Sequence, residues 1–155
     1  MSKTCVLILD NLRSVENTGS IFRTAEGLGV AKIVCVGTTP TPLDRFGRKR
    51  SDFTKVSLGA EEIDWEYKKE IGPVLKELKD QGFEIIALEQ SAKSENLKVF
   101  KAPSQFALIV GNEVGGVSPE TLELCESVLE IPMVGKKESL NVSVSTGIAL
   151  YKLLQ

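Results

Sequence analysis

Histidine is absent from this 155-residue sequence, and cysteine is scarce. Without histidine the chain lacks the usual general base near neutral pH and the commonest metal ligand. This excludes hydrolases that pair a serine or a cysteine with histidine. The three cysteines, Cys5, Cys35 and Cys125, lie far apart and form no CxxC pair. They therefore indicate neither a disulfide framework nor a metal site, and each is expected to be a small core residue.

Long apolar stretches are also missing. No run approaches the ~20 residues that a membrane helix needs. The first residues, MSKTCVLILD, do not resemble a cleavable signal. The length fits one domain with a single core. We therefore expect a soluble, cytoplasmic protein with no metal and no membrane partner.

The net charge of -2 hides an asymmetry between the two parts of the chain. Residues 1–60 carry nine Lys or Arg and five Asp or Glu, a net charge of +4, whereas residues 61–155 carry ten and sixteen, a net charge of -6. Four basic side chains lie in the segment DRFGRKR and could contact phosphates; a solvated surface loop fits equally well. They are Arg45, Arg48, Lys49 and Arg50.

Short β-branched runs alternate with segments of helical spacing along the chain, which predicts an α/β domain. The sheet is expected to be mostly parallel, with helices on both faces. Residues 37–52 are typical of a long loop, and residues 53–64 fit either a strand or a turn. The expected strands are 4–9, 32–36, 83–89, 104–111 and 127–133, and the expected helices are 21–28, 73–82, 118–127 and 141–154.

Three polar loops each follow an expected strand and open an expected helix. They are residues 10–23, 110–118 and 131–143, and in parallel sheets ligands bind where such loops meet. The middle loop, GNEVGGVS, lacks the lysine of a phosphate-binding P-loop and the GxGxxG spacing of dinucleotide folds. Its glycines indicate either a tight turn or close approach of the backbone to a ligand, and Glu113 lies among them.

Arg23 and the last helix each permit two interpretations. Arg23 fits a surface arginine on an amphipathic helix, or a guanidinium that binds a phosphate or carboxylate at the carboxyl edge of the sheet. The last helix is apolar nearly all round, with Val144, Ile148 and Tyr151 on one face, and is expected to be buried on several sides. It is either a core helix or a core helix that also forms a subunit interface.

The three loops together resemble the three motifs of the SpoU (TrmH-type) RNA ribose 2'-O-methyltransferases of the SPOUT superfamily. The matching segments are NTGSIFRTAEGLG, LIVGNEVGGVS and IPMVGKKESLNVSVSTGIAL, and the resemblance spans essentially the whole chain. It implies one catalytic domain over residues 1–155, with a C-terminal deep trefoil knot and no separate RNA-binding domain. It further implies S-adenosylmethionine as cofactor, a homodimer, and methylation of a ribose 2'-hydroxyl in RNA.

The resemblance also implies roles for individual residues. The cofactor is expected to contact Leu88, Gly111, Asn112, Ile131, Met133, Ser139 and Leu140. The residues expected to act in catalysis are Arg23, Asn17, Glu113, Ser139 and Asn141. Asn17 is expected to hold the RNA or Arg23, and Ser139 is expected to contact the cofactor or the ribose. Glu113 and Asn141 are expected to hold Arg23 and a loop of the neighbouring subunit. Arg23 and the basic residues of DRFGRKR are expected to bind RNA.

The role of Arg23 and the substrate stay open at this point. The family assigns activation of the hydroxyl to this arginine, but a guanidinium is a poor proton acceptor. The alternative is that Arg23 clamps a phosphate and stabilises the forming alkoxide. Residues 89–97, EQSAKSENL, look more like the tRNA guanosine-18 enzymes, which favours tRNA over ribosomal RNA. A non-enzymatic RNA-binding module is the rival from another class, and the missing phosphate fingerprints exclude a nicotinamide or ATP enzyme.

Overall fold

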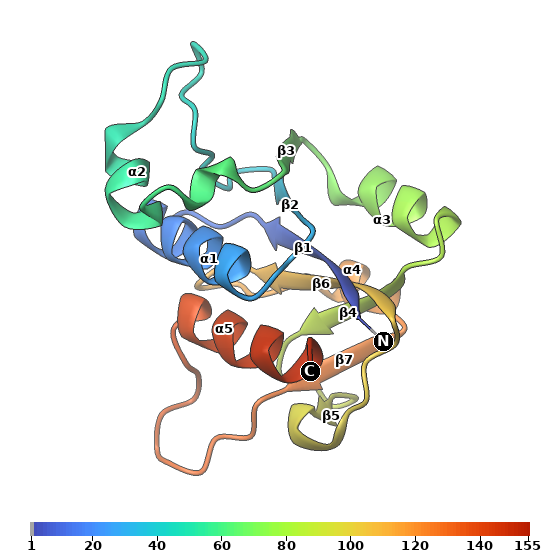
Figure 1. Cartoon of the computed structure of the whole chain (residues 1–155). Coiled ribbons are helices and arrows are strands. Elements are labelled where there is room, and N and C mark those ends of the chain that lie inside the picture. Colours follow the sequence, from blue (N-terminus) through green and yellow to red (C-terminus); the bar gives the residue numbers. More distant parts are fainter. Residues whose placement is uncertain (1) are drawn as a thin grey trace.

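A single parallel sheet of seven strands organises the computed structural model, which describes residues 2–155 (Figure 1). The strand order is β3-β2-β1-β6-β4-β7-β5, and every pairing is parallel. The predicted parallel α/β architecture is therefore confirmed. The strands are β1 (Thr4–Asp10), β2 (Lys32–Val36), β3 (Trp65–Lys68), β4 (Glu84–Leu88), β5 (Glu95–Asn96), β6 (Gln105–Gly111) and β7 (Ser127–Glu130).

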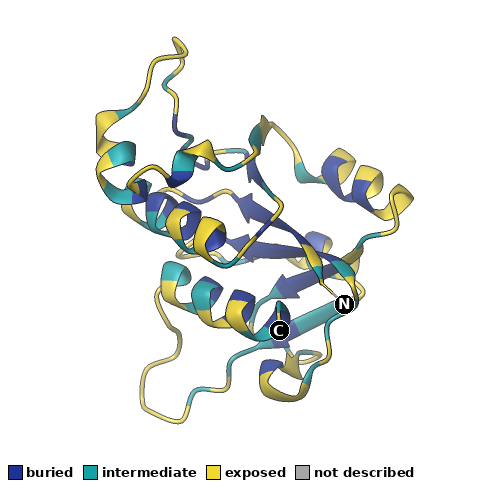
Figure 2. Cartoon of the chain, in the orientation of Figure 1, coloured by how far each residue is buried: buried dark blue, intermediate teal, exposed yellow. Residues whose placement is uncertain are grey.

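Helices cover both faces of the sheet, as predicted (Figure 1). One face packs against α1, α2 and α5 and the other against α3 and α4, so two hydrophobic clusters flank strands that are buried on both sides (Figure 2). Within residues 2–155 no helix is long and apolar enough to cross a membrane. The helices are α1 (Val15–Gly27), α2 (Ser51–Ser57), α3 (Ile71–Asp80), α4 (Pro119–Glu123) and α5 (Val142–Leu153), with short 3-10 turns η1 (Ala60–Glu62) and η2 (Leu97–Val99).

Helix α1 begins in a polar sequence because Ser14 caps it. The Ser14 hydroxyl accepts a hydrogen bond from the backbone N–H of Asn17 at 3.0 Å, which satisfies one of the free donors of the first turn. Ile21, Phe22 and Ala25 recur at helical spacing and are fully buried against the sheet. Their buried face fixes the direction in which the polar residues of the first turn point.

Residues 53–64 do not form the predicted strand or turn; they belong mainly to α2 and η1, and α2 already starts at Ser51. Tertiary packing decides this conformation, since the Phe53 ring meets the Phe22 ring edge-on with 5.0 Å between centroids. The β-branched residues of this short segment carry a weak helical signal on their own. Strands β3 and β5 were not predicted either, because both are short edge strands with little buried surface.

Helix α5 is less buried than its sequence predicts. Thr146, Ala149 and Leu150 are buried against α1 and the sheet. On the other face Val144, Ile148 and Tyr151 are 51%, 43% and 63% exposed in the single chain, so burial on several sides is wrong for one chain. The exposed apolar face lies along α5, where it adjoins α1.

Candidate functional site

The three polar loops meet at the carboxyl edge of the sheet and enclose a cavity of about 710 Å³. They follow β1, β6 and β7, and parallel strands bring their carboxyl ends to one edge. The volume lies in the range of pockets that hold small ligands or cofactors. The sequence expectation that these loops come together is therefore confirmed as a matter of geometry.

Glu113, in the loop after β6, holds the start of α1. Its carboxylate accepts hydrogen bonds from the backbone N–H groups of Arg13 at 3.1 Å and Ser14 at 2.9 Å, and from the Asn17 amide at 3.4 Å. Partial burial raises the pKa of the carboxyl, but these donors and its own backbone N–H outweigh it, and the pKa lies below its usual value. The charge also lies at the positive end of the α1 dipole.

Asn17 links this contact to the third loop. Its side-chain oxygen accepts a hydrogen bond from the Asn141 amide at 3.1 Å. Asn141 in turn caps α5, because its side-chain oxygen accepts from the N–H of Ser143 at 2.9 Å. Glu113, Asn17 and Asn141 thus form one chain of hydrogen bonds across all three loops, which we call the three-loop network.

Replacement of Glu113 by glutamine is expected to lower the free energy of unfolding by about 1 kcal/mol near pH 7, because charged hydrogen bonds to a helix start are lost. A carboxyl whose folded pKa lies below its ordinary value of 4.5 stabilises the fold above that pH and loses this contribution as pH falls through the folded pKa. The difference between wild type and E113Q should therefore shrink as the pH falls below 4.5 and be lost once the folded carboxyl is protonated. Urea unfolding at several pH values measures it.

Glu26→Gln is the matched control for this titration. Glu26 is exposed on α1 and its side chain makes no hydrogen bond or ion pair within residues 2–155. Its replacement should change stability by less than about 0.5 kcal/mol at every pH. A pH-independent effect of E113Q would show that Glu113 acts through packing and not through its charge.

The loop after β6 closes on itself so tightly that Gly111 tolerates no side chain. A Cβ at Gly111 would lie 2.5 Å from the backbone carbonyl of Gly116 and 2.6 Å from the nitrogen of Val117. Asn112 completes the turn, since its side-chain oxygen accepts from the N–H groups of Val114 at 2.8 Å and Gly115 at 3.0 Å. Of the two interpretations of these glycines, the structure shows the tight turn directly.

All residues predicted to contact the cofactor line the cavity. The structure places Asn17, Glu113 and Asn141 there as well, but this placement does not test their roles, which stay predictions. The lining residues among those predicted are Asn17, Leu88, Gly111, Asn112, Glu113, Ile131, Met133, Ser139, Leu140 and Asn141.

Glu89 and Gln90, directly after β4, also line the cavity and were missed. The Glu89 carboxylate accepts from the N–H of Val117 at 2.8 Å, and the Gln90 amide donates to the carbonyl of Glu138 at 2.9 Å. They join the walls formed by the second and third loops. The available signal was their position, because polar residues immediately after a central strand lie at the carboxyl edge.

Within one chain Arg23 is not held by Glu113 or Asn141, because both residues contact Asn17. The predicted contact with Arg23 stays a prediction. Arg23 is exposed on α1, does not line the cavity, and makes no hydrogen bond or ion pair within the described residues. Arg23 lies six positions after Asn17 on α1, which places it about 240° further around the helix axis, so the two side chains point in different directions. A single chain therefore does not bring Arg23 into the three-loop network.

The basic residues of DRFGRKR lie away from the cavity, in the segment between β2 and α2 that projects from the body (Figure 1). Arg48 pairs with Asp44 at 3.0 Å and Arg50 pairs with Asp52 at 2.8 Å. Within residues 2–155, Arg45 and Lys49 have no ion-pair partner. The structure thus separates a cavity from a basic projection.

Comparison with known proteins matches most of the chain to one family. The model of the SpoU rRNA Methylase family matches residues 4–151. A tRNA (guanosine(18)-2'-O)-methyltransferase from Aquifex aeolicus is 33% identical over 153 residues, covering 97% of this chain and 68% of that protein. The 23S rRNA (guanosine-2'-O-)-methyltransferase RlmB from Neisseria meningitidis is 34% identical over 146 residues, covering 94% of this chain but 56% of that protein.

Solved structures share the fold. The TrmH/SpoU tRNA modifying enzyme of A. aeolicus superposes with a TM-score of 0.82 at 29% identity, covering 98% of this chain and 74% of that chain. An AdoMet-bound rRNA methyltransferase from Sinorhizobium meliloti superposes with a TM-score of 0.86 at 24% identity, covering 98% of this chain and 56% of that chain. This similarity shows the fold alone. Among these four proteins, this chain spans from 56% to 74% of the other chain's length.

Proposed function

Because this chain belongs to the SpoU rRNA Methylase family, we propose that it transfers a methyl group from S-adenosylmethionine to a ribose 2'-hydroxyl in RNA. The observation that carries the proposal is the cavity at the carboxyl edge, which gathers all three motif loops and every predicted cofactor contact. The three-loop network braces that cavity. The hydrogen bonds hold its walls in one arrangement before any ligand binds.

The cavity residues fit this cofactor chemically. Leu88, Ile131 and Leu140 offer apolar surface to an adenine ring, whereas the backbone of the loops offers hydrogen-bonding groups for the ribose and amino acid parts. Because Gly111 has no side chain, the backbone of Gly116 and Val117 can pack directly against it in the cavity wall. The cofactor supplies an electrophilic methyl group on a sulfonium.

Arg23 is proposed to position the acceptor. Its guanidinium binds the phosphate beside the target nucleotide and stabilises the alkoxide that forms at the ribose. When bound, S-adenosylmethionine would supply the methyl group to the ribose oxygen that Arg23 holds in place, and phosphate or water would accept the hydroxyl proton. Alignment of donor and acceptor supplies much of the rate in such a displacement.

A homodimer is proposed to complete the site. The exposed apolar face of α5, with Val144, Ile148 and Tyr151, borders Ser20 and Thr24 of α1 along one shallow hollow. An apolar surface of this kind fits a second copy of the chain. Since Arg23 lies on the same helix as Ser20 and Thr24, pairing through this face would bring it towards the partner's cavity.

A deep trefoil knot is proposed for the C-terminal part. Strand β5 pairs on the outer side of β7, so the chain between β4 and β6 passes across β7, while α5 returns to pack beside α1. The Gln90–Glu138 contact joins the crossing segment to the loop before α5. This arrangement supports threading, which is rare in proteins. A crystal structure traced through residues 89–141 tests it.

Transfer RNA is the preferred substrate and ribosomal RNA the alternative. The A. aeolicus relative acts on tRNA, by its name, and the N. meningitidis relative acts on 23S rRNA. Their identities to this chain are nearly equal, so identity does not separate the two substrates. The preference rests on residues 89–97, whose sequence resembles the guanosine-18 group.

Cofactor binding and methyl transfer test the proposal together. S-adenosylmethionine at about 100 times its Kd should raise the melting temperature by about 5 to 10 °C, whereas NAD and ATP should not. Labelled cofactor should then transfer methyl to unmodified total tRNA and yield a 2'-O-methyl nucleoside. Transfer to ribosomal RNA alone would reverse the substrate preference. RNA and cofactor binding without any transfer would favour the binding-module function.

A further inference from the structure

Residues 43–49 form a small hairpin at the outer end of the segment between β2 and α2, which we call the 43–49 hairpin (Figure 1). Leu43 and Lys49 pair as an antiparallel bridge. Within it the N–H of Asp44 donates to the carbonyl of Arg48 at 2.8 Å, and the N–H of Gly47 donates to the carbonyl of Asp44 at 2.9 Å. The tip therefore has a defined turn conformation.

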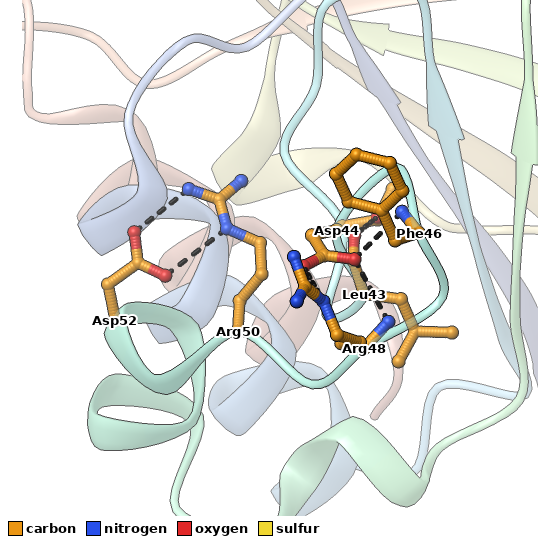
Figure 3. Close-up of polar contacts among 7 residues, drawn as sticks. Leu43, Asp44, Phe46, Arg48, Arg50 and Asp52 are labelled. Carbon is orange, nitrogen blue, oxygen red and sulfur yellow. Dashed lines mark hydrogen bonds and ion pairs between the residues drawn. The ribbon is translucent and has the colours of Figure 1, made fainter.

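Asp44 holds this turn through its side chain. Its carboxylate accepts from the N–H groups of Phe46 at 2.8 Å and Arg48 at 2.9 Å, and from the Arg48 guanidinium at 3.0 Å (Figure 3). An aspartate that binds backbone groups two and four residues ahead is a recognised way to rigidify a turn. The position of Phe46 at the tip is thus built by specific contacts.

Phe46 presents an aromatic ring to solvent. The residue is 66% exposed, although a phenylalanine is usually buried. The guanidinium carbons of Arg45 and Arg48 lie 4.8 and 5.0 Å from the ring centroid. Both guanidinium groups are exposed, so a ligand can reach the ring beside them or displace one of them. The tip combines an exposed aromatic ring with two planar cations that lie over it.

We propose that Phe46 stacks on an unpaired base of the substrate RNA, while Arg45 and Lys49 contact the adjacent phosphates. An aromatic ring within a positively charged tip is the chemistry that binds single-stranded nucleic acid. Of the four basic residues in DRFGRKR, Arg45 and Lys49 have no ion-pair partner in the described residues, so no carboxylate competes there with a phosphate. This inference rests on the proposed RNA substrate and adds the recognition of an unpaired nucleotide away from the reaction centre.

The experiment measures binding of the full chain to two probes by fluorescence anisotropy. One is a labelled single-stranded oligoadenylate of about 12 nucleotides, and the other is the same strand paired with oligouridylate. Phe46→Ala should weaken binding of the single strand about 5- to 100-fold and leave the duplex nearly unchanged. Phe46→Trp should bind the single strand at least as well as wild type, because tryptophan offers a larger ring for stacking.

Two further variants separate stacking from charge. Lys49→Gln should reduce the salt dependence of binding by about one phosphate contact, whereas Phe46→Ala should leave that dependence unchanged. Val99→Ala is the matched control, since Val99 is an apolar side chain 74% exposed on η2, and it should bind like wild type. Equal loss of single strand and duplex in Phe46→Ala would overturn the stacking role.

The inference and the proposed function fail differently. If methyl transfer to tRNA or ribosomal RNA occurs but Phe46→Ala binds and turns over like wild type, the stacking role is wrong and the function stands. If no transfer occurs but the single-strand preference depends on Phe46, the stacking role stands without the enzyme. A change of oligomeric state in Phe46→Ala, with RNA binding intact, would assign the hairpin to a protein contact and overturn the inference.

Discussion

Replacement of Gly111 by alanine is expected to weaken S-adenosylmethionine binding and to slow methyl transfer at least about 100-fold, since a misplacement near 1 Å in a site costs a factor of this size in rate. The added Cβ would lie 2.5 Å from the backbone of Gly116, too close for any real contact. Because the obstacle is backbone, the whole wall of the cavity must move. Calorimetric titration of the cofactor and the thermal shift measure the loss.

Gly115→Ala is the matched control in the same loop. A Cβ there would lie 4.0 Å from the Asn112 side-chain oxygen, an ordinary contact. This variant should bind the cofactor within about threefold of wild type, which is a surface-like effect of less than ~1 kcal/mol. Far-ultraviolet circular dichroism establishes that both variants are folded. Normal cofactor affinity in a folded G111A variant would show that this wall does not form the cofactor site.

Arg23→Ala should lower kcat/KM by about 100- to 1000-fold, the size of the effect when one charged donor to a developing oxyanion is lost. Cofactor affinity should be unchanged, because Arg23 is proposed to bind the RNA phosphate and not the cofactor. Arg23→Lys keeps the charge but not the forked donors, and should recover part of the activity. Arg23→Gln should be as inactive as alanine. Single-turnover methyl transfer with saturating cofactor gives the rates.

Mixing the two inactive variants tests whether the site is shared between subunits. A dimer of R23A with G111A has one intact cavity facing one intact arginine. Random exchange should therefore restore about a quarter of wild-type activity if each arginine serves the partner's cavity. Each variant incubated alone is the control. No recovery, despite subunit exchange seen by mass, would place Arg23 and the cofactor in the same chain.

The sequence patterns predicted the central fold well because the central strands are buried on both faces. Their continuous β-branched runs need no distant partner to be recognised. Helix α2 could not be predicted in this way, since it depends on Phe53 meeting Phe22 from another helix. Strand β5 has two residues, both exposed, and leaves almost no pattern.

The candidate site likewise has a part that the sequence predicts and a part that it does not. Loops after parallel strands must meet at one edge, so the cavity residues could be placed from order alone. The hydrogen-bond partner of Glu113 could not be predicted from the order of the loops, because it depends on the angular positions of Asn17 and Arg23 around α1. Glu89 contacts Val117 across 28 residues of sequence, and no motif marks that pair.

The three-loop network also bears on how the chain folds. Its hydrogen bonds join residues 96 and 124 positions apart, from Asn17 to Glu113 and from Asn17 to Asn141. Contacts of such long sequence separation close late and slow folding, because the intervening chain must be ordered first. During synthesis, Asn141 leaves the ribosome after most of the sheet has been made. The ability to bind cofactor is thus expected to appear in the final folding step. The rate at which binding appears during refolding therefore reports the rate of that step.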